Sequence, residues 1–211
     1  DIFFEDLQIR QPDHILECRS DTLMGQVGSI LSKCEAVMLK EKPERLLILG
    51  DTNSALSAFV AKRMGIPVFH MEAGNRCYDD RVPEEVNRRV IDHSSDILLP
   101  YTERSRANLL KEGIASDRIF VTGNPIKEVL DFYETQISSS KVLEKMSLKK
   151  GEYFLITMHR AENVDQAVRL SSLIKAFNQL YIKFNVPILC SLHPRTEIGR
   201  ASCRERVCHR V

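Results

Sequence analysis

Short apolar runs alternate with longer amphipathic stretches along residues 45–137. The apolar runs are continuous, without alternating polar positions, and they lie at 45–50, 67–70, 97–99 and 119–121. Such runs are typical of strands that are buried on both faces. Apolar residues then recur at helical spacing in stretches around 56–64, 83–93, 102–112 and 126–137. The pattern predicts βαβ units, that is, an α/β fold whose parallel sheet is covered by helices on both faces.

A polar segment rich in Ser and Lys interrupts this pattern at 138–151, as a linker would. The pattern then restarts, with a strand at 153–157, a long amphipathic helix at 165–184 and a strand at 186–192. We therefore expect a first domain over 1–137, the start of a second domain over 152–196 and a tail at 197–211. The tail is rich in Arg and has no clear period, so we interpret it as non-native sequence; an ordinary basic surface tail is the alternative.

Charge and cysteine content exclude several classes of protein. The 211 residues carry 30 basic and 29 acidic side chains, a net charge of +1, whereas binding to nucleic acid needs a surplus of positive charge. No apolar run approaches the roughly 18 residues of a membrane helix, and the acidic start is unlike a signal peptide. The start also lacks Met, as expected of a trimmed chain. Six cysteines without a C-x-x-C pair indicate reduced thiols and a cytoplasmic protein.

Polar and charged residues gather at the carboxyl ends of the predicted strands. Open parallel sheets bind ligands at this edge, and core strands have no need of acids, histidines or arginines there. The clustering therefore points to a functional site. In chain order its residues are Asp51, Thr52, His70, Glu72, Gly74, Asn75, Arg76, Tyr101, Thr102, Thr122, Gly123, Asn124, Pro125, His159, Arg160, Glu162, Asn163 and His193.

The helix predicted over 83–93 carries acids that have a structural explanation. Glu84 and Glu85 follow Pro83 at the helix start, where acids interact well with the helix dipole. They precede Arg88 and Arg89 by four residues, the spacing of helical ion pairs. On these grounds alone a structural role is the simpler interpretation of both glutamates. His93, at the end of the same helix, is explained most simply as a partner of the dipole.

The remaining acids at the strand ends also have explanations other than a functional role. Asp51 could cap the helix that begins near Thr52, and Glu72 could be a solvated loop acid. A metal site is a third possibility, but the candidate ligands lack any dense spacing, so we expect no metal; they are His70, Glu72, Asp79, Asp80 and His93. The chain also lacks a glycine-rich dinucleotide motif, a P-loop and a G-x-S-x-G elbow.

Five motifs in order resemble the non-hydrolysing UDP-N-acetylglucosamine 2-epimerases over residues 1–196. They are Leu-Gly-Asp-Thr at 49–52, His-Met-Glu-Ala-Gly-Asn-Arg at 70–76, Pro-Glu-Glu-Val-Asn-Arg at 83–88, Thr-Gly-Asn-Pro at 122–125 and Met-His-Arg-Ala-Glu-Asn at 158–163. As a set they are highly specific. The sequence of residues 74–85 resembles that of the branch that contains UDP-N-acetyl-L-fucosamine synthases, which act on a UDP-6-deoxy-amino-sugar.

The resemblance implies two Rossmann-like domains, as in GT-B glycosyltransferases, with the active site in the cleft between them. It implies a UDP-sugar substrate, no metal or redox cofactor, and a homodimer. The implied reaction interconverts UDP-N-acetylglucosamine and UDP-N-acetylmannosamine for cell-surface polysaccharide precursors. UDP is eliminated to leave a 2-acetamidoglycal and is then added back with the opposite configuration at carbon 2. Carboxyl groups with tuned pKa values and one His suit this proton chemistry.

The resemblance also assigns roles to residues of this chain. The catalytic positions fall on Asp51, Glu72, Glu84 and His159. Which carboxyl group is the base and which is the acid stays open. The residues expected to bind substrate are Arg76, Arg88, Asn124, Arg160, Glu162 and His193.

Two motifs of the family are absent from the chain. One is the amino-terminal strand of the first domain with its Gly-Thr-Arg-Pro-Glu motif, and the other is the Ser-Gly-Gly-x-x-Glu-Glu region that holds UDP. We therefore expect the chain by itself to be inactive and poorly stable. The alternatives to a 2-epimerase are a GT-B-type glycosyltransferase, a hydrolysing epimerase and a non-catalytic module that binds a UDP-sugar.

Overall fold

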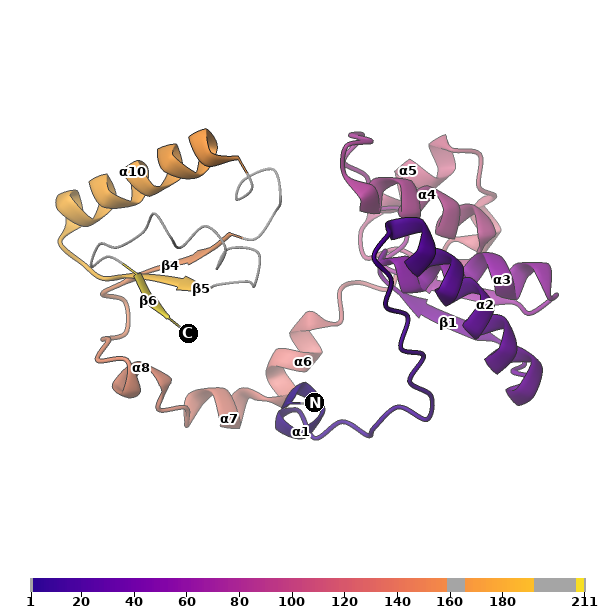
Figure 1. Cartoon of the computed structure of the whole chain (residues 1–211), viewed down its shortest axis with the longest axis horizontal. Coiled ribbons are helices and arrows are strands. Elements are labelled where there is room, and N and C mark those ends of the chain that lie inside the picture. The colour runs from indigo at the N-terminus through magenta and orange to yellow at the C-terminus, as the bar shows by residue number, and fades with distance from the viewer. Residues whose placement is uncertain (1, 159–165, 192–207, 211) are drawn as a thin grey trace. The chain divides into compact units, whose positions relative to one another are not determined.

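The computed structural model describes residues 2–158, 166–191 and 208–210. The chain divides into two compact units, Asp1–Val129 and Leu130–Val211, which are coloured along the chain in Figure 1. The division falls earlier than the domain end that we predict at residue 137. The predicted helix at 126–137 is two helices, α6 (Ile126–Phe132) and α7 (Glu134–Ser138), and α6 runs across the division.

The first unit contains a parallel sheet of three strands in the order β1 (Leu46–Leu49), β2 (Val68–Met71), β3 (Ile97–Leu99). The 3₁₀ helix η1 (Asn53–Leu56) and α3 (Ser57–Arg63) connect β1 to β2, and α4 (Pro83–Ser94) connects β2 to β3. After β3 comes α5 (Glu103–Lys111), where the Thr102 hydroxyl accepts the Ser105 N–H as an N-cap at 3.1 Å. The α/β fold with parallel strands is thus confirmed.

The predicted strand at 119–121 does not form. Ile119 makes an isolated parallel bridge to Leu98, and the N–H groups of Phe120 and Thr122 donate to the carbonyls of Leu98 and Pro100. The bond that would lie between these two needs an N–H on Pro100, which proline lacks. The segment therefore runs beside β3 without a continuous ladder.

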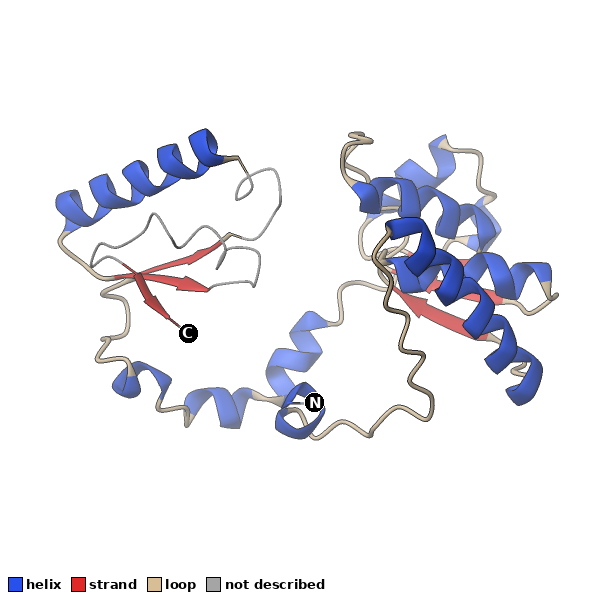
Figure 2. Ribbon diagram, in the orientation of Figure 1, coloured by secondary structure: helices blue, strands red, loops and turns tan. Residues whose placement is uncertain are grey.

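Helices cover one face of this sheet. Ile48, His70 and Leu98 are aligned across the strands and buried, and α2 (Leu23–Glu41) packs on α3 above the same core. On the opposite face, Leu47 and Leu49 are 63% and 61% exposed. The expectation of two covered faces is wrong for the residues that the structure describes. Right-handed crossovers between strands in sequential order place every connecting helix on one side, as the helices and strands in Figure 2 illustrate.

The second unit repeats the strand–helix–strand pattern. The strands β4 (Phe154–Thr157), β5 (Ile188–Ser191) and β6 (Cys208–Arg210) form a parallel sheet in that order, and α10 (Ala167–Phe184) connects β4 to β5. The short helix α8 (Val142–Lys145) lies within the predicted linker. The strand β6 was not expected, because it lies in the tail that shows no period.

Two short elements complete the described chain, α1 (Ile2–Asp6) and the 3₁₀ helix η2 (Ser116–Arg118). Among the described helices of both units, none combines the length and the apolar character that crossing a membrane requires.

Candidate active site

The carboxyl ends of β1 and β2 bring Asp51 and Glu72 to the same edge of the sheet. Gly50 follows β1 with a φ of +81°, and a Cβ placed on it would lie 3.8 Å from Oε2 of Glu72. The Glu72 carboxylate therefore lies against the residue that precedes Asp51. Glu72 itself has a φ of +67°, in the left-handed region, and its N–H donates to the carbonyl of Leu99 at 3.1 Å. A non-glycine residue in this conformation stores strain, which is common at functional sites.

Asp51 forms an ion pair with α4. Its Oδ2 accepts Nε–H of Arg88 at 2.8 Å, and its carbonyl accepts the side-chain amide of Asn87 at 3.0 Å. Asp51 does not cap the following helix, since η1 begins after Thr52, whose side chain makes no capping bond. The structure thus joins two of the predicted site residues, Asp51 and Arg88, directly.

The two adjacent glutamates at the start of α4 have different surroundings. Glu85 is fully buried, and its carboxylate accepts the N–H groups of Cys77 and Tyr78 at 3.0 and 2.9 Å and pairs with Arg88 at 3.0 Å. Burial alone would raise the pKa of Glu85, but these hydrogen bonds lower it to about 2. The side chain of Glu84 is exposed and makes no hydrogen bond or ion pair to another described residue. The structural interpretation therefore fits Glu85, and Glu84 is free to meet a ligand.

Two polar residues interact with the Glu72 carboxylate, Asn75 and Tyr101. The side-chain amide of Asn75 donates to Oε1 of Glu72 at 3.1 Å. The hydroxyl of Ser105 in turn donates to Oδ1 of Asn75 at 3.0 Å. Partial burial and the charge of Glu72 raise the pKa of Tyr101, which follows β3. The sequence marks Tyr101 as a strand-end residue, but it indicates no role for this side chain.

Arg76 is buried and forms ion pairs with two carboxylates of the first unit. Its guanidinium is fully buried, lies 2.8 Å from Asp92 and 2.6 Å from Glu112, and donates to the carbonyl of Asn75 at 2.7 Å. Burial lowers the pKa of Arg76, but the two carboxylates outweigh burial and raise it; Arg76 in turn lowers the pKa of Glu112. These contacts leave the guanidinium turned away from solvent, so Arg76 connects its loop to α4 and to the end of α5.

Asp92 and His70 extend this buried network, and neither is among the residues predicted to be catalytic or to bind substrate. Asp92 lies on α4 and is fully buried, with its Oδ1 at 2.8 Å from Nδ1 of His70. The sequence marks His70 as a polar residue at the end of a predicted strand and as a candidate metal ligand, whereas in the structure β2 places it on the buried face of the sheet. No periodic signal marks Asp92.

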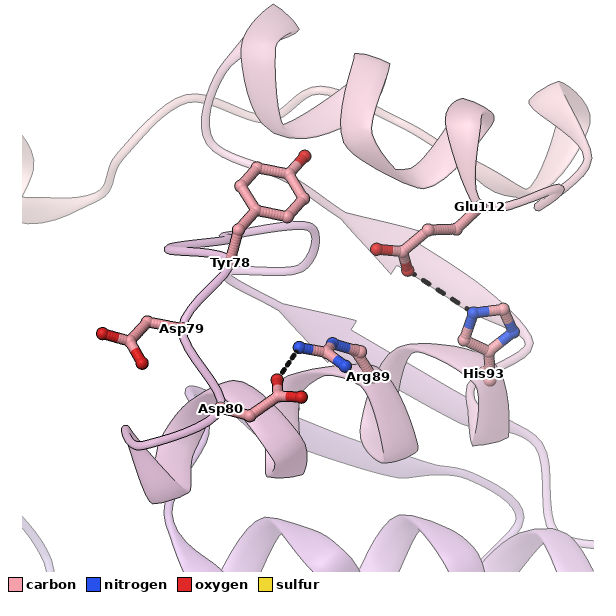
Figure 3. Close-up of a pocket in the computed structure, with 6 residues that line it drawn as sticks. All are labelled: Tyr78, Asp79, Asp80, Arg89, His93 and Glu112. Atoms are coloured by element: carbon pink, nitrogen blue, oxygen red, sulfur yellow. Dashed lines mark hydrogen bonds and ion pairs between the residues drawn. The ribbon is translucent and has the colours of Figure 1, made fainter.

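A pocket of about 590 Å³ opens on the other side of α4, where α4 faces the 78–80 loop and the end of α5. Figure 3 shows Arg89 paired with Asp80, and His93 facing Glu112 at 3.5 Å. His93 thus interacts with a carboxylate of the neighbouring helix end. Asp51, Glu72 and Glu84, the predicted catalytic residues that the structure describes, do not line this pocket. Its lining residues are Tyr78, Asp79, Asp80, Arg89, His93 and Glu112.

The other predicted site residues fall into two groups. Asn124 is exposed, and its side-chain oxygen accepts the N–H of Ile126 at 2.9 Å in a turn. The predictions for His159, Arg160, Glu162 and His193 lie outside the described residues. Within the described part, no three His, Cys, Asp or Glu side chains are grouped so that they could hold a metal ion.

Fold and site together define an α/β protein that gathers carboxylates at one strand-end edge of a parallel sheet. A family model described as UDP-N-acetylglucosamine 2-epimerase matches residues 1–207. The chain belongs to the UDP-N-acetylglucosamine 2-epimerase family, and the resemblance seen in the five motifs is confirmed.

Individual relatives agree with this assignment. The UDP-N-acetylglucosamine 2-epimerase of Methanococcus maripaludis is 40% identical over 200 residues, which cover 92% of this chain and 54% of the relative. The UDP-2,3-diacetamido-2,3-dideoxy-D-glucuronate 2-epimerase of Pseudomonas aeruginosa is 39% identical, with 93% and 55% covered. The chain therefore spans about half the length of the curated relatives that it matches.

Solved structures of this family have the same fold. The UDP-N-acetylglucosamine 2-epimerase of Rickettsia bellii has a TM-score of 0.91 at 39% identity, covering 100% of this chain and 58% of that one. The Methanocaldococcus jannaschii enzyme, solved in complex with UDP-GlcNAc and UDP, has a TM-score of 0.90 at 35% identity, with 100% and 60% covered. These relatives establish the GT-B-like α/β fold expected from the resemblance.

Proposed function

We propose that the protein to which this chain belongs interconverts UDP-N-acetylglucosamine and UDP-N-acetylmannosamine. The observation that carries the proposal is the strand-end edge, where Asp51 and Glu72 lie close together and Arg88 joins Asp51 to α4. Glu84 stands one helical turn before Arg88, so the two side chains share a face of α4. Three carboxylates thus border one edge in a chain whose family acts on UDP-N-acetylhexosamines.

Inversion at carbon 2 requires the removal of a weakly acidic proton. A base takes this proton, the electron pair of the C–H bond forms the C1=C2 double bond, and the C1–O bond breaks to release UDP. We infer that Glu84 is the base, because it is exposed and has no partner among the described residues. It lies in the first turn of α4, where an acid interacts favourably with the helix dipole.

The return step needs a proton donor on the opposite face of the sugar. UDP then adds back to C1 while carbon 2 is protonated, which completes the inversion. Glu72 is suited to proton transfer because its carboxylate accepts one side-chain amide, that of Asn75. Its other neighbours are Gly50 and Tyr101. Asp51, held by Arg88, would orient the substrate. His159, Asn124, Arg160, Glu162 and His193 stay predicted participants.

The identity of the sugar is a separate part of the proposal. The 39% identical relative from Pseudomonas aeruginosa is named for a 2,3-diacetamido glucuronate sugar, and the wording of 74–85 is similar to the 6-deoxy branch. UDP-N-acetylglucosamine is favoured because the majority of the named relatives above carry it in their names. We further propose a cytoplasmic homodimer that does not bind nucleic acid, in keeping with the net charge of +1 and with Cys18, Cys34 and Cys77 outside any disulfide.

Deuterium exchange at carbon 2 tests the proposal. The protein expressed from its whole reading frame is incubated in deuterated water with UDP-N-acetylglucosamine or with the 6-deoxy UDP-sugar, and carbon 2 is followed by NMR. Deuterium gain together with the epimer is expected for UDP-N-acetylglucosamine. Exchange in the 6-deoxy sugar alone would reassign the substrate, and free N-acetylmannosamine would indicate a hydrolysing enzyme. UDP-sugar binding without exchange would refute epimerisation and favour a transferase or a binding module.

Glu84→Gln tests the base. Exchange should fall by at least about 10²-fold, the scale of general base catalysis. Glu103→Gln is the matched control, since Glu103 is an exposed acid in the first turn of α5 and should leave exchange unchanged. Equal activity of Glu84→Gln and Glu103→Gln would exclude Glu84 as the base.

A further inference from the structure

His70 is a polar side chain in the middle of an apolar sheet face. It is 1% exposed and is aligned between Ile48 and Leu98 on the neighbouring strands. Its Nδ1 lies 2.8 Å from Oδ1 of Asp92, and its Nε2 lies 3.0 Å from the carbonyl oxygen of Gly50. Both ring nitrogens therefore have a partner within hydrogen-bond distance.

Both of these partners are acceptors. A carbonyl oxygen cannot donate, so Nε2 of His70 must carry a hydrogen. Asp92 is held as a carboxylate, because its Oδ2 lies 2.8 Å from the Arg76 guanidinium and accepts the N–H of Gly74 at 3.1 Å. Nδ1 must then carry a hydrogen as well, which makes the ring an imidazolium.

The charges of the buried network balance in this state. His70 and Arg76 are the cations, and Asp92 and Glu112 are the anions, each within contact of an opposite charge. Buried charges persist in proteins when they are paired in this way. A neutral His70 would leave one anion of the network in excess and one acceptor without a donor.

The partners of this network belong to the two loops that carry the proposed catalytic acids. Gly50 precedes Asp51, and the Gly74 N–H that binds Asp92 lies in the loop that begins with Glu72. We propose that His70 is a positioning residue of the active site, whose imidazolium fixes the Asp51 loop through the Gly50 carbonyl and the Glu72 loop through Asp92. The inference rests on the proposed epimerase function for its consequence in catalysis.

Two amide substitutions separate the two hydrogen bonds of the ring. In His70→Gln the new side-chain amide nitrogen would take the place of Nε2 and keep the bond to Gly50, while in His70→Asn it would take the place of Nδ1 and keep the bond to Asp92. Both variants lose one donor and the same positive charge. If positioning of the Asp51 loop matters, His70→Asn should lower kcat by about 10²-fold with little change in KM, the effect of a misplacement of about 1 Å. His70→Gln should stay within about tenfold of the wild type.

Two measurements do not depend on turnover. Nitrogen-15 NMR of histidine-labelled wild-type protein should show both ring nitrogens of His70 protonated. Hydrogen exchange at the Gly50 amide, which donates to the Met71 carbonyl at 3.2 Å, should be faster in His70→Asn than in His70→Gln. A ring with one bare nitrogen, or equal kcat and equal exchange in both variants, would overturn the inference. An inactive wild type would refute the epimerase function alone, since the NMR and exchange results would still decide the role of His70. If one variant failed to fold, the NMR of the wild type would still test the imidazolium.

Discussion

Glu85→Gln is expected to destabilise the first unit although it replaces the side chain with one of nearly equal shape. The pKa of Glu85 is lowered from 4.5 to about 2 in the folded protein, so folding favours the ionised form. One pKa unit corresponds to about 1.4 kcal/mol, which puts the loss of this carboxylate at about 3 kcal/mol. Cys77 and Tyr78, which donate to it, are exposed to solvent, so screening reduces the expected loss to about 2 kcal/mol.

The assay is urea unfolding followed by circular dichroism, with hydrogen exchange at the Cys77 and Tyr78 amides as a local probe. Because the folded pKa lies below the unfolded value, the stabilisation is fully present above pH 4.5 and is lost as the pH falls toward about 2. The difference between wild type and Glu85→Gln should therefore shrink over this interval. Glu84→Gln, one residue away and exposed, should unfold like the wild type. Equal midpoints for Glu84→Gln and Glu85→Gln at neutral pH would refute the reasoning.

Two further substitutions test the loop after β2. A Cβ on Gly74 would lie 2.3 Å from the carbonyl oxygen of Ser105, and Gly74 has a φ of +77°; Gly74→Ala should therefore cost more than the about 1–2 kcal/mol of the left-handed conformation alone. Gly113→Ala, at a φ of +85° with open space around it, should show only that smaller cost in thermal unfolding, and equal losses would exclude the clash. Arg76→Met should lower the free energy of unfolding by about 3–5 kcal/mol in urea, because it removes the buried cation that the carboxylates of Asp92 and Glu112 share; a loss below about 1 kcal/mol would contradict the paired network.

Local pattern predicted the elements that local forces determine. The continuous apolar runs place β1, β2 and β3 within a residue or so of their observed bounds. The segment at 119–121 is equally apolar, yet its ladder fails because of a missing N–H on Pro100, the residue that follows the neighbouring strand β3. The open face of the sheet likewise follows from the order and handedness of the crossovers, which no single window of sequence contains.

The candidate site also has a part that the sequence predicts and a part that depends on contacts between distant residues. The common location of Asp51 and Glu72 could be predicted from their place after strands, since strand ends converge at one edge in any parallel sheet. Glu84 and Glu85 are indistinguishable by position, and only the fold of the 76–81 loop, whose N–H groups meet Glu85, separates them. Arg76 has the charge of a substrate ligand, but Asp92 on α4 turns it into a buried ion-pair partner. Such pairings join residues far apart in the chain and leave no pattern in it.

The left-handed backbone conformation of Glu72 lowers the stability of the fold at the position that carries a proposed catalytic carboxylate. Holding a non-glycine residue at a φ of +67° costs about 1–2 kcal/mol, and glycine would relieve that cost while giving back up to about 1 kcal/mol through the entropy of the unfolded chain. Glu72→Gly should then yield a protein as stable as the wild type or more so, yet without the carboxylate for which we propose proton transfer. A selection for thermal tolerance alone would therefore favour glycine here, whereas a selection for the proposed chemistry would favour the glutamate.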